Sequence, residues 1–175
     1  KGIIYCAVFK KKDDRTIYNM IYRDGGSGNT MMKRFPVSSV TRSKNYILTR
    51  SEKGSKVLYF TANPNGETET ITVYLRKSAR LKTPKIDVDF AALGIKGKGA
   101  VGNIVTKNSV KKIELKSKGV STLSARKIWF DCSVGRLNVD QRGELLGAFK
   151  AEDKILTILN SGEIELKSFD ISNHF

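Results

Sequence analysis

Apolar and polar residues alternate along much of this chain, and this period of two constrains its fold more than any other feature. Residues 70–76 read Thr-Ile-Thr-Val-Tyr-Leu-Arg, and similar alternation recurs at 112–116 and 163–167. Successive side chains of a β-strand point to opposite faces of the sheet, so each segment predicts a strand with one buried and one solvated face. Helical periodicity is poor throughout, and the pattern predicts an all-β fold.

Short clusters of Asn, Asp, Gly and Ser separate these strands and predict tight hairpin turns. They occupy residues 24–29, 63–66, 107–109, 140–143 and 160–162. Four of them recur at spacings of 38, 42 and 54 residues, measured between Gly28, Gly66, Asn108 and Gly162. Periods of about 40–50 residues in an all-β chain are typical of the four-stranded blades of a propeller-like array. A single β-sandwich is the competing interpretation.

Basic side chains outnumber acidic ones by 32 to 17, which gives a net charge of +15. Residues 1–75 carry +7, residues 76–127 carry +11 and residues 128–175 carry −3. The basic residues are interleaved with Val, Ile, Leu and Gly, so they belong to folded strands and turns. This polarity predicts a basic face and a polyanionic partner, with nucleic acid first and an anionic membrane second. No apolar run is long enough to cross a bilayer, and no amphipathic basic helix favours a membrane surface.

Motifs of common enzyme classes are absent from the sequence. It contains no Walker motif, no H-E-x-x-H and no G-x-S-x-G. The one histidine, His174, lies next to the end of the chain, so histidine-dependent nucleophilic chemistry is not expected. Cys6 and Cys132 lie far apart without a CxxC, which favours a reducing compartment over a zinc site or a disulfide framework. The chain starts at Lys1 rather than Met, and we expect it to be part of a longer protein.

Residues 97–102 match the pattern G-x-G-x-x-G, but their context differs from a dinucleotide site. The segment that follows, 103–107, is rich in β-branched residues and predicts a strand, whereas the dinucleotide fingerprint must open a helix. A glycine-rich turn that bears Lys96 and Lys98 can instead bring its backbone and two ammonium groups close to phosphates. The alternative is a plain glycine turn between strands.

Five segments carry a resemblance to a known family. They are KRFPVSSVTR at 33–42, VLYFTANPNG at 57–66, KGKGAVGNIVTK at 96–107, RKIWFD at 126–131 and FDISNHF at 169–175. Together they resemble the C-terminal domain of the type IIA DNA topoisomerase A subunit, in the topoisomerase IV form of Bacteroidetes-type bacteria. The related gyrase subunits carry a Q-R-R-G-G-K-G box for tight wrapping. Residues 95–99 keep its Gly and Lys but lack the Gln and both Arg, which favours a role in relaxation or decatenation.

This resemblance implies a β-pinwheel, in which propeller-like blades exchange strands and duplex DNA bends around a basic outer rim. We expect a single domain over 1–175 with about four blades, at roughly 1–50, 51–95, 96–130 and 131–175. The implied parent enzyme passes one duplex through another, and its catalytic tyrosine lies in a cleavage core outside this chain. We therefore expect no catalysis and no cofactor here, with the six tyrosines packed between strands. ATP and Mg²⁺ act through the B subunit and the cleavage core.

The implied partners are duplex DNA, the rest of a homodimeric A subunit and the ATPase B subunit, in the bacterial cytoplasm at the nucleoid and not at a membrane. Lys33 and Arg34 are adjacent on a predicted strand, so they should point to opposite faces. The alternative function is a protein-interaction platform within the topoisomerase complex, formed by the acidic last third. The candidate DNA contacts are Lys33, Arg34, Arg42, Lys56, Lys96, Lys98, Lys107, Lys111, Lys112, Arg126 and Lys127, with Arg136 and Arg142 as weaker candidates.

Overall fold

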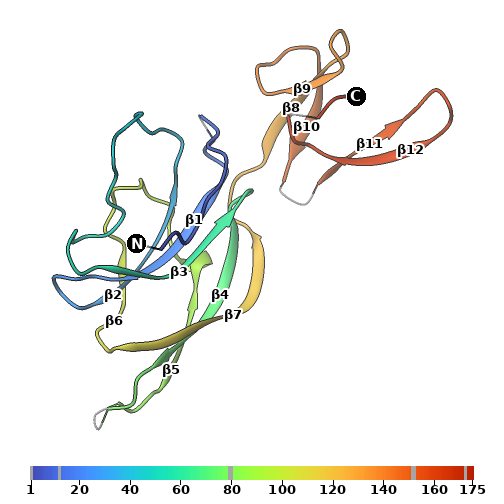
Figure 1. The fold of residues 1–175 in the computed structure, drawn as a ribbon. Coiled ribbons are helices and arrows are strands. Elements are labelled where there is room, and N and C mark those ends of the chain that lie inside the picture. Colours follow the sequence, from blue (N-terminus) through green and yellow to red (C-terminus); the bar gives the residue numbers. More distant parts are fainter. Residues whose placement is uncertain (1, 12, 79–80, 151–152, 172) are drawn as a thin grey trace. The chain divides into compact units, whose positions relative to one another are not determined.

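The computed structural model describes residues 2–11, 13–78, 81–150, 153–171 and 173–175. Over these residues the chain forms twelve β-strands and one short 3-10 helix, so the predicted all-β class is confirmed (Figure 1). Its contacts fall into two compact units, Lys1–Thr122 (unit 1) and Leu123–Phe175 (unit 2). Among the described residues, no helix has the length and apolar character needed to cross a bilayer.

Two antiparallel sheets build unit 1. The first sheet has the order β3-β1-β2-β6 and the second has the order β5-β4-β7. The strands of the first sheet are β1 (Ile17–Arg23), β2 (Thr30–Pro36), β3 (Lys56–Asn63) and β6 (Asn103–Thr106). Those of the second are β4 (Glu67–Leu75), β5 (Lys85–Asp89) and β7 (Val110–Ser121), with the 3-10 helix η1 (Phe90–Ala92) directly after β5.

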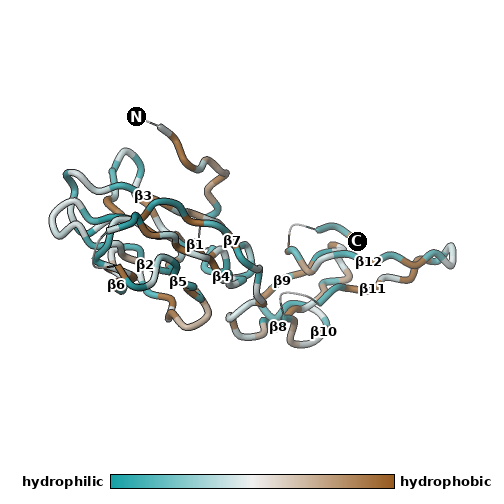
Figure 2. The backbone as a smooth tube through the Cα atoms, turned by 90° about the horizontal axis from the view of Figure 1, so that it is seen from below, coloured by the Kyte–Doolittle hydropathy of each residue, from teal (hydrophilic) through white to brown (hydrophobic). Residues whose placement is uncertain are grey.

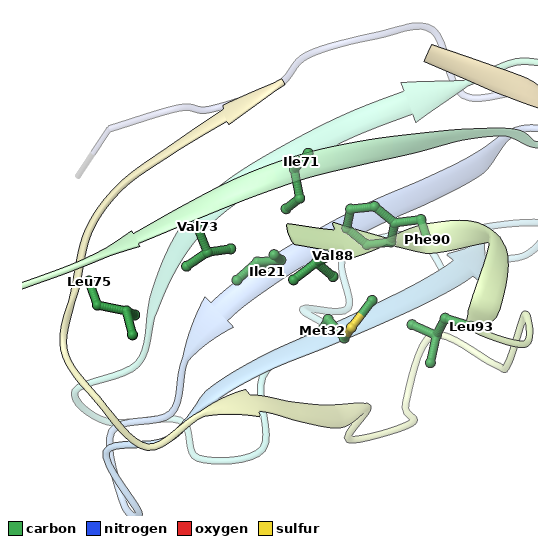
Figure 3. Packing of buried hydrophobic residues seen from close by; sticks show 8 residues of the cluster. All are labelled: Ile21, Met32, Ile71, Val73, Leu75, Val88, Phe90 and Leu93. Atoms are coloured by element: carbon green, nitrogen blue, oxygen red, sulfur yellow. The ribbon is translucent and has the colours of Figure 1, made fainter. Parts of the chain in front are cut away.

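The main core of unit 1 lies where the two sheets face each other (Figure 3). It contains Ile21, Met32, Ile71, Val73, Leu75, Val88, Phe90 and Leu93. The opposite face of the first sheet is also covered, because Met20, Tyr22, Met31 and Phe35 are buried against the segment that includes Val37 and Leu48. Strands β1 and β2 are therefore buried on both faces, which explains why the sequences around Met20 and Met31 do not alternate.

Unit 2 is smaller and has its own core. A three-stranded sheet of order β10-β8-β9 is joined by a two-stranded hairpin. The strands are β8 (Arg126–Asp131), β9 (Arg136–Asn138), β10 (Glu144–Phe149), β11 (Lys154–Ile158) and β12 (Ile164–Ser168). Ile128, Leu137, Ile155 and Phe169 form the buried cluster.

The alternation pattern predicted strand positions better than strand orientation. Residues 70–76 form most of β4, and Ile71, Val73 and Leu75 are buried as expected. Residues 163–167 also supply a strand, but its faces are reversed, since Ile164 and Leu166 are 67% and 66% exposed. The reason is that the opposite face of the hairpin, which carries Ile155, packs on the core of unit 2.

The sheets contain four, three, three and two strands, which is consistent with the predicted β-pinwheel-like fold although only one sheet has the expected four strands. The first sheet pairs strands from 17–36, 56–63 and 103–106, so it takes residues from both sides of the proposed limits at 50 and 95. The blade limits stay a prediction. The turns at 63–66 and 107–109 connect the two sheets of unit 1 instead of closing hairpins.

Candidate nucleic-acid interface

The charge of the chain separates between the two units. Unit 1 contains 25 basic and nine acidic residues, a net +16, whereas unit 2 contains seven and eight, a net −1. The whole basic excess therefore belongs to unit 1, and a polyanion should be attracted to that unit.

The glycine-rich segment 96–102 runs along the outer side of β2 and leads directly into the edge strand β6. The Lys96 N–H donates to the Arg34 carbonyl at 3.0 Å, and Asn103 pairs with Met32. Gly102 has φ +94°, and a Cβ there would lie 2.3 Å from the Met32 carbonyl oxygen, so only glycine fits this close approach.

A second segment, residues 37–47, packs beside this glycine-rich segment and adds charge to it. The Lys98 ammonium donates to the Ser39 carbonyl at 2.7 Å and lies 4.7 Å from the centre of the Tyr46 ring. The Lys44 ammonium lies 5.5 Å from the same ring. The Tyr46 hydroxyl is in turn held by the backbone N–H and the hydroxyl of Thr41. We call the four basic residues gathered by these two segments the basic loop cluster: Arg42, Lys44, Lys96 and Lys98.

Three further basic side chains lie at one end of the first sheet. Lys56 on β3 is the cross-strand neighbour of Arg23 on β1. The same row continues through Thr30 to Thr106 on β6, and Lys107 follows Thr106. Arg23, Lys56 and Lys107 are all exposed. We call these three residues the end row.

The structure places Arg34 in the interior of unit 1, where its side chain is 1% exposed. Its guanidinium donates to Asn19 Oδ1 at 3.0 Å, to the Gly66 carbonyl at 3.0 Å and to Thr122 Oγ1 at 3.0 Å. Longer bonds reach the carbonyls of Phe90 and Glu67. A guanidinium with these partners cannot reach a phosphate, and Arg34 leaves the set of candidate DNA contacts.

Lys33 is also buried and leaves the set for the same reason, with a side chain only 2% exposed. Its ammonium donates to the carbonyls of Lys98 and Ala100 and lies 4.6 Å from the Phe35 ring centre. Burial lowers the pKa of Lys33 to about 8 and also lowers that of Arg34. The two side chains contact different surroundings, so the prediction that they point to opposite faces is confirmed.

The lysines of β7 are partly neutralised by their neighbours. Lys112 forms an ion pair with Glu114 at 2.6 Å, and this contact raises the pKa of Lys112. Lys116 pairs with Asp87 on β5. Lys111 is exposed on the same strand. Because Glu114 and Asp87 offset two of the charges, strand β7 offers a weaker field than the basic loop cluster.

The remaining candidates lie in unit 2. Arg126 is half-buried, and Lys127 is exposed next to it on β8. Arg136 is exposed on β9 and donates from Nε to His174 Nε2 at 2.9 Å. Arg142 lies in the exposed turn before β10. These four share a unit whose acidic residues outnumber its basic ones.

Sequence reasoning missed Arg23, Lys44 and Tyr46, which the structure places in the candidate basic clusters. Lys44 follows Arg42 closely, and this pair of cations in a loop was an available signal. Arg23 directly precedes the first turn cluster, but its place beside Lys56 depends on the pairing of β1 with β3. That pairing joins residues more than thirty positions apart and has no local signature.

The comparisons with known proteins agree with the resemblance carried by the five sequence segments. A family model described as the topoisomerase C-terminal domain of Bacteroidota matches residues 1–118 and 136–175. No curated protein and no solved structure matches the chain. Because the family model covers nearly the whole chain, this protein belongs to the family of bacterial topoisomerase C-terminal domains.

Proposed function

We propose that this domain binds duplex DNA without reading its sequence and holds a bent segment for the strand-passage core of a type IIA topoisomerase. The observation that carries the proposal is the +16 charge of unit 1, displayed at the basic loop cluster and the end row. The domain supplies no chemistry of its own in this scheme. Cleavage belongs to the rest of a homodimeric A subunit, and ATP hydrolysis belongs to the B subunit, in the bacterial cytoplasm.

Lysine and arginine side chains at these two places would replace counterions on successive phosphates. Seven such contacts give a slope of log affinity against log salt of about −6. Base recognition is not expected, since phosphate contacts carry no sequence information and a topoisomerase acts on many sequences. The departure of residues 95–99 from the gyrase box favours bending for relaxation or decatenation over tight wrapping.

Duplex binding with matched charge variants tests the proposal. The variant R42Q/K44Q/K96Q/K98Q removes the basic loop cluster, and R142Q/K127Q/K150Q/K154Q removes four exposed basic residues from unit 2. We expect the first variant to flatten the salt slope by roughly 3 to 4 and the second to change it much less. Equal losses would show that net charge alone governs binding, and the site would be refuted.

Bending is tested with duplexes of increasing length labelled at both ends for energy transfer. A smooth bend over ~20–30 base pairs costs roughly 1–6 kcal/mol, so it forms only if contacts beyond the first compensate for it. We expect affinity to rise with length and the ends to approach each other on binding. Affinity that does not depend on length would remove bending from the proposal.

A second candidate function is contact with another protein chain of the same topoisomerase complex through unit 2. One face of the β11–β12 hairpin carries four apolar residues, which the strand register places on the same side. Figure 2 shows hydrophobic residues in the hairpin. Their side chains are 57% to 71% exposed: Leu156, Ile158, Ile164 and Leu166. A two-stranded hairpin is marginal alone, and an apolar face of this kind is typical of a docking surface.

Binding of the isolated domain to the purified cleavage core of the parent enzyme tests this second candidate. L156T/I164T should weaken the complex, while the control V134T/L145T changes two other exposed apolar residues of unit 2 and should not. Equal binding by wild type and L156T/I164T would exclude the hairpin as a docking surface.

A further inference from the structure

Lys33 donates its ammonium to a segment that it does not belong to. From the middle of β2 the Nζ atom reaches the Lys98 carbonyl at 2.6 Å and the Ala100 carbonyl at 2.9 Å. Tyr22 on the adjacent strand β1 adds a third bond, because its hydroxyl donates to the Val101 carbonyl at 2.7 Å. Three carbonyls within four consecutive residues are therefore held by two side chains from the sheet.

These bonds determine which way the backbone of the segment faces. In a trans peptide the carbonyl of one residue and the N–H of the next point in opposite directions, and no described peptide of this chain is cis. With the carbonyls of Lys98 and Ala100 turned toward Lys33, the N–H groups of Gly99 and Val101 turn away from it. Gly99 and Val101 are both exposed. The Ala100 N–H between them donates to the Gly97 carbonyl at 2.9 Å. Two outward N–H groups beside lysine ammonium groups add positive potential on this side of the segment, which favours an anion.

We propose that Lys33 is a positioning residue that fastens segment 96–102 to the first sheet and so keeps the basic loop cluster in its DNA-binding conformation. The inference rests on the proposed function, since it assigns a role toward the same DNA site. Lys33 does not touch DNA in this scheme. It acts through the backbone of Lys98 and Ala100, and Tyr22 acts in the same way through Val101.

The chemistry of lysine suits this position. An apolar side chain in place of Lys33 would leave two carbonyls without their donor, which is costly in a buried site. The bonds of a cation to carbonyl oxygens are also stronger than those of a neutral donor. Lys33 is only 2% exposed and its carbonyl partners lie on a loop, so its ammonium ties the loop to the sheet.

The charged and titratable groups around Lys33 come from three elements. Lys98 on the glycine-rich segment directs its own ammonium to Ser39, and Tyr22 on β1 bonds to Val101 and to the Arg50 N–H. Arg34, next on β2, faces the other side. No described carboxylate is bonded to Lys33, and burial lowers its pKa to about 8. As pH rises from 7 to 9 the ammonium becomes a neutral amine, and we expect the segment to loosen as the charge-assisted part of each bond is lost.

The test combines amide hydrogen exchange at 97–102 with duplex binding for three variants. Exchange is read at the Ala100 N–H, which donates to the Gly97 carbonyl at 2.9 Å. K33M removes the donor and its charge. K85M removes an exposed lysine charge on the second sheet and is the matched control. Y22F removes only the hydroxyl, which keeps the ring packed and the net charge unchanged, so it tests the same fastening if K33M folds poorly.

We expect K33M to speed exchange at 97–102 by about tenfold or more while amides of β4 keep their rates, and to weaken duplex binding about tenfold more than K85M does. Y22F should act in the same direction by about threefold or more. The advantage of wild type over K33M should shrink between pH 7 and pH 9.

Exchange at 97–102 that is unchanged in both K33M and Y22F would overturn the fastening. Faster exchange with duplex binding equal to that of K85M would overturn the positioning role while leaving the fastening intact. The proposed function itself fails through a different result, which is duplex binding by R42Q/K44Q/K96Q/K98Q equal to that of the unit 2 control.

Discussion

Replacing Arg34 with methionine should lower the free energy of unfolding of unit 1. It should not remove a DNA contact, because the side chain is buried. The guanidinium is 1% exposed and donates to a side-chain amide, a hydroxyl and three carbonyls. Two of the carbonyl partners, Gly66 and Phe90, are themselves buried. Through these carbonyls Arg34 links the turn between the two sheets to the first sheet. Losing the guanidinium should therefore destabilise both sheets of unit 1.

The size of the effect follows from the groups left behind. Each buried carbonyl or amide without its donor costs about 1–3 kcal/mol. Methionine recovers part of this loss, because an apolar side chain has no charge to desolvate. We expect R34M to lower the free energy of unfolding of unit 1 by about 3–5 kcal/mol, the range for removing one partner of a buried charged network.

Urea unfolding can follow the two units separately. All six tyrosines lie in unit 1 and the single tryptophan, Trp129, lies in unit 2. R34M should shift the near-ultraviolet tyrosine transition and leave the Trp129 fluorescence transition in place. R42M changes an exposed arginine and should move neither by more than about 0.5 kcal/mol. A tyrosine transition at the wild-type midpoint, together with a flatter salt slope for DNA, would refute the buried role of Arg34.

Three further predictions concern single positions. G102A should lower the free energy of unfolding of unit 1 by more than about 1 kcal/mol, because a Cβ at this positive φ meets the Met32 carbonyl. The control G97A has open space around the added Cβ and should be tolerated. Equal urea midpoints for the two variants would contradict this prediction. I128A should cost unit 2 about 2–5 kcal/mol and shift only the Trp129 transition, since Ile128 is fully buried there. Hydrogen bonds from Ser27 and Ser51 hold the pKa of Asp24 far below its usual range. Unit 1 should therefore lose stability as pH falls below about 4. In acid unfolding curves, D24N should make this loss of stability smaller.

The local sequence pattern was enough to locate strands, but it could not show which face of each strand would be buried in a core and which would be exposed to solvent. The alternation at 70–76 predicted β4 with the correct buried side, because its apolar residues lie in the core shared with the first sheet. The same alternation at 163–167 gave β12 with its faces reversed, since the core of unit 2 lies on the side of Ile155. Turn chemistry had a similar limit. The turn at 63–66 reverses the chain, and only the tertiary structure shows that it changes sheets there.

The error at Lys33 and Arg34 has a signal that sequence reasoning can use. The pair lies within Met31-Met32-Lys33-Arg34-Phe35, where apolar neighbours occur on both faces of the strand. A strand with two apolar faces is buried on both sides, so a cation within it must find internal acceptors. Lys96 and Lys98, by contrast, lie on either side of Gly97 in a glycine-rich turn, and the structure places both in the basic loop cluster.

Strand β2 therefore uses two adjacent cations to hold two different parts of unit 1. Lys33 bonds to the glycine-rich segment on one face, and Arg34 bonds to the Gly66 turn and to Thr122 on the other. Substituting either one should weaken DNA binding, K33M through a displaced segment and R34M through a smaller folded fraction. The two causes separate on addition of a stabilising osmolyte, which favours the compact state by exclusion from the protein surface. We expect an osmolyte to restore duplex binding to R34M and not to K33M, and recovery of both would mean that Lys33, like Arg34, acts on stability alone.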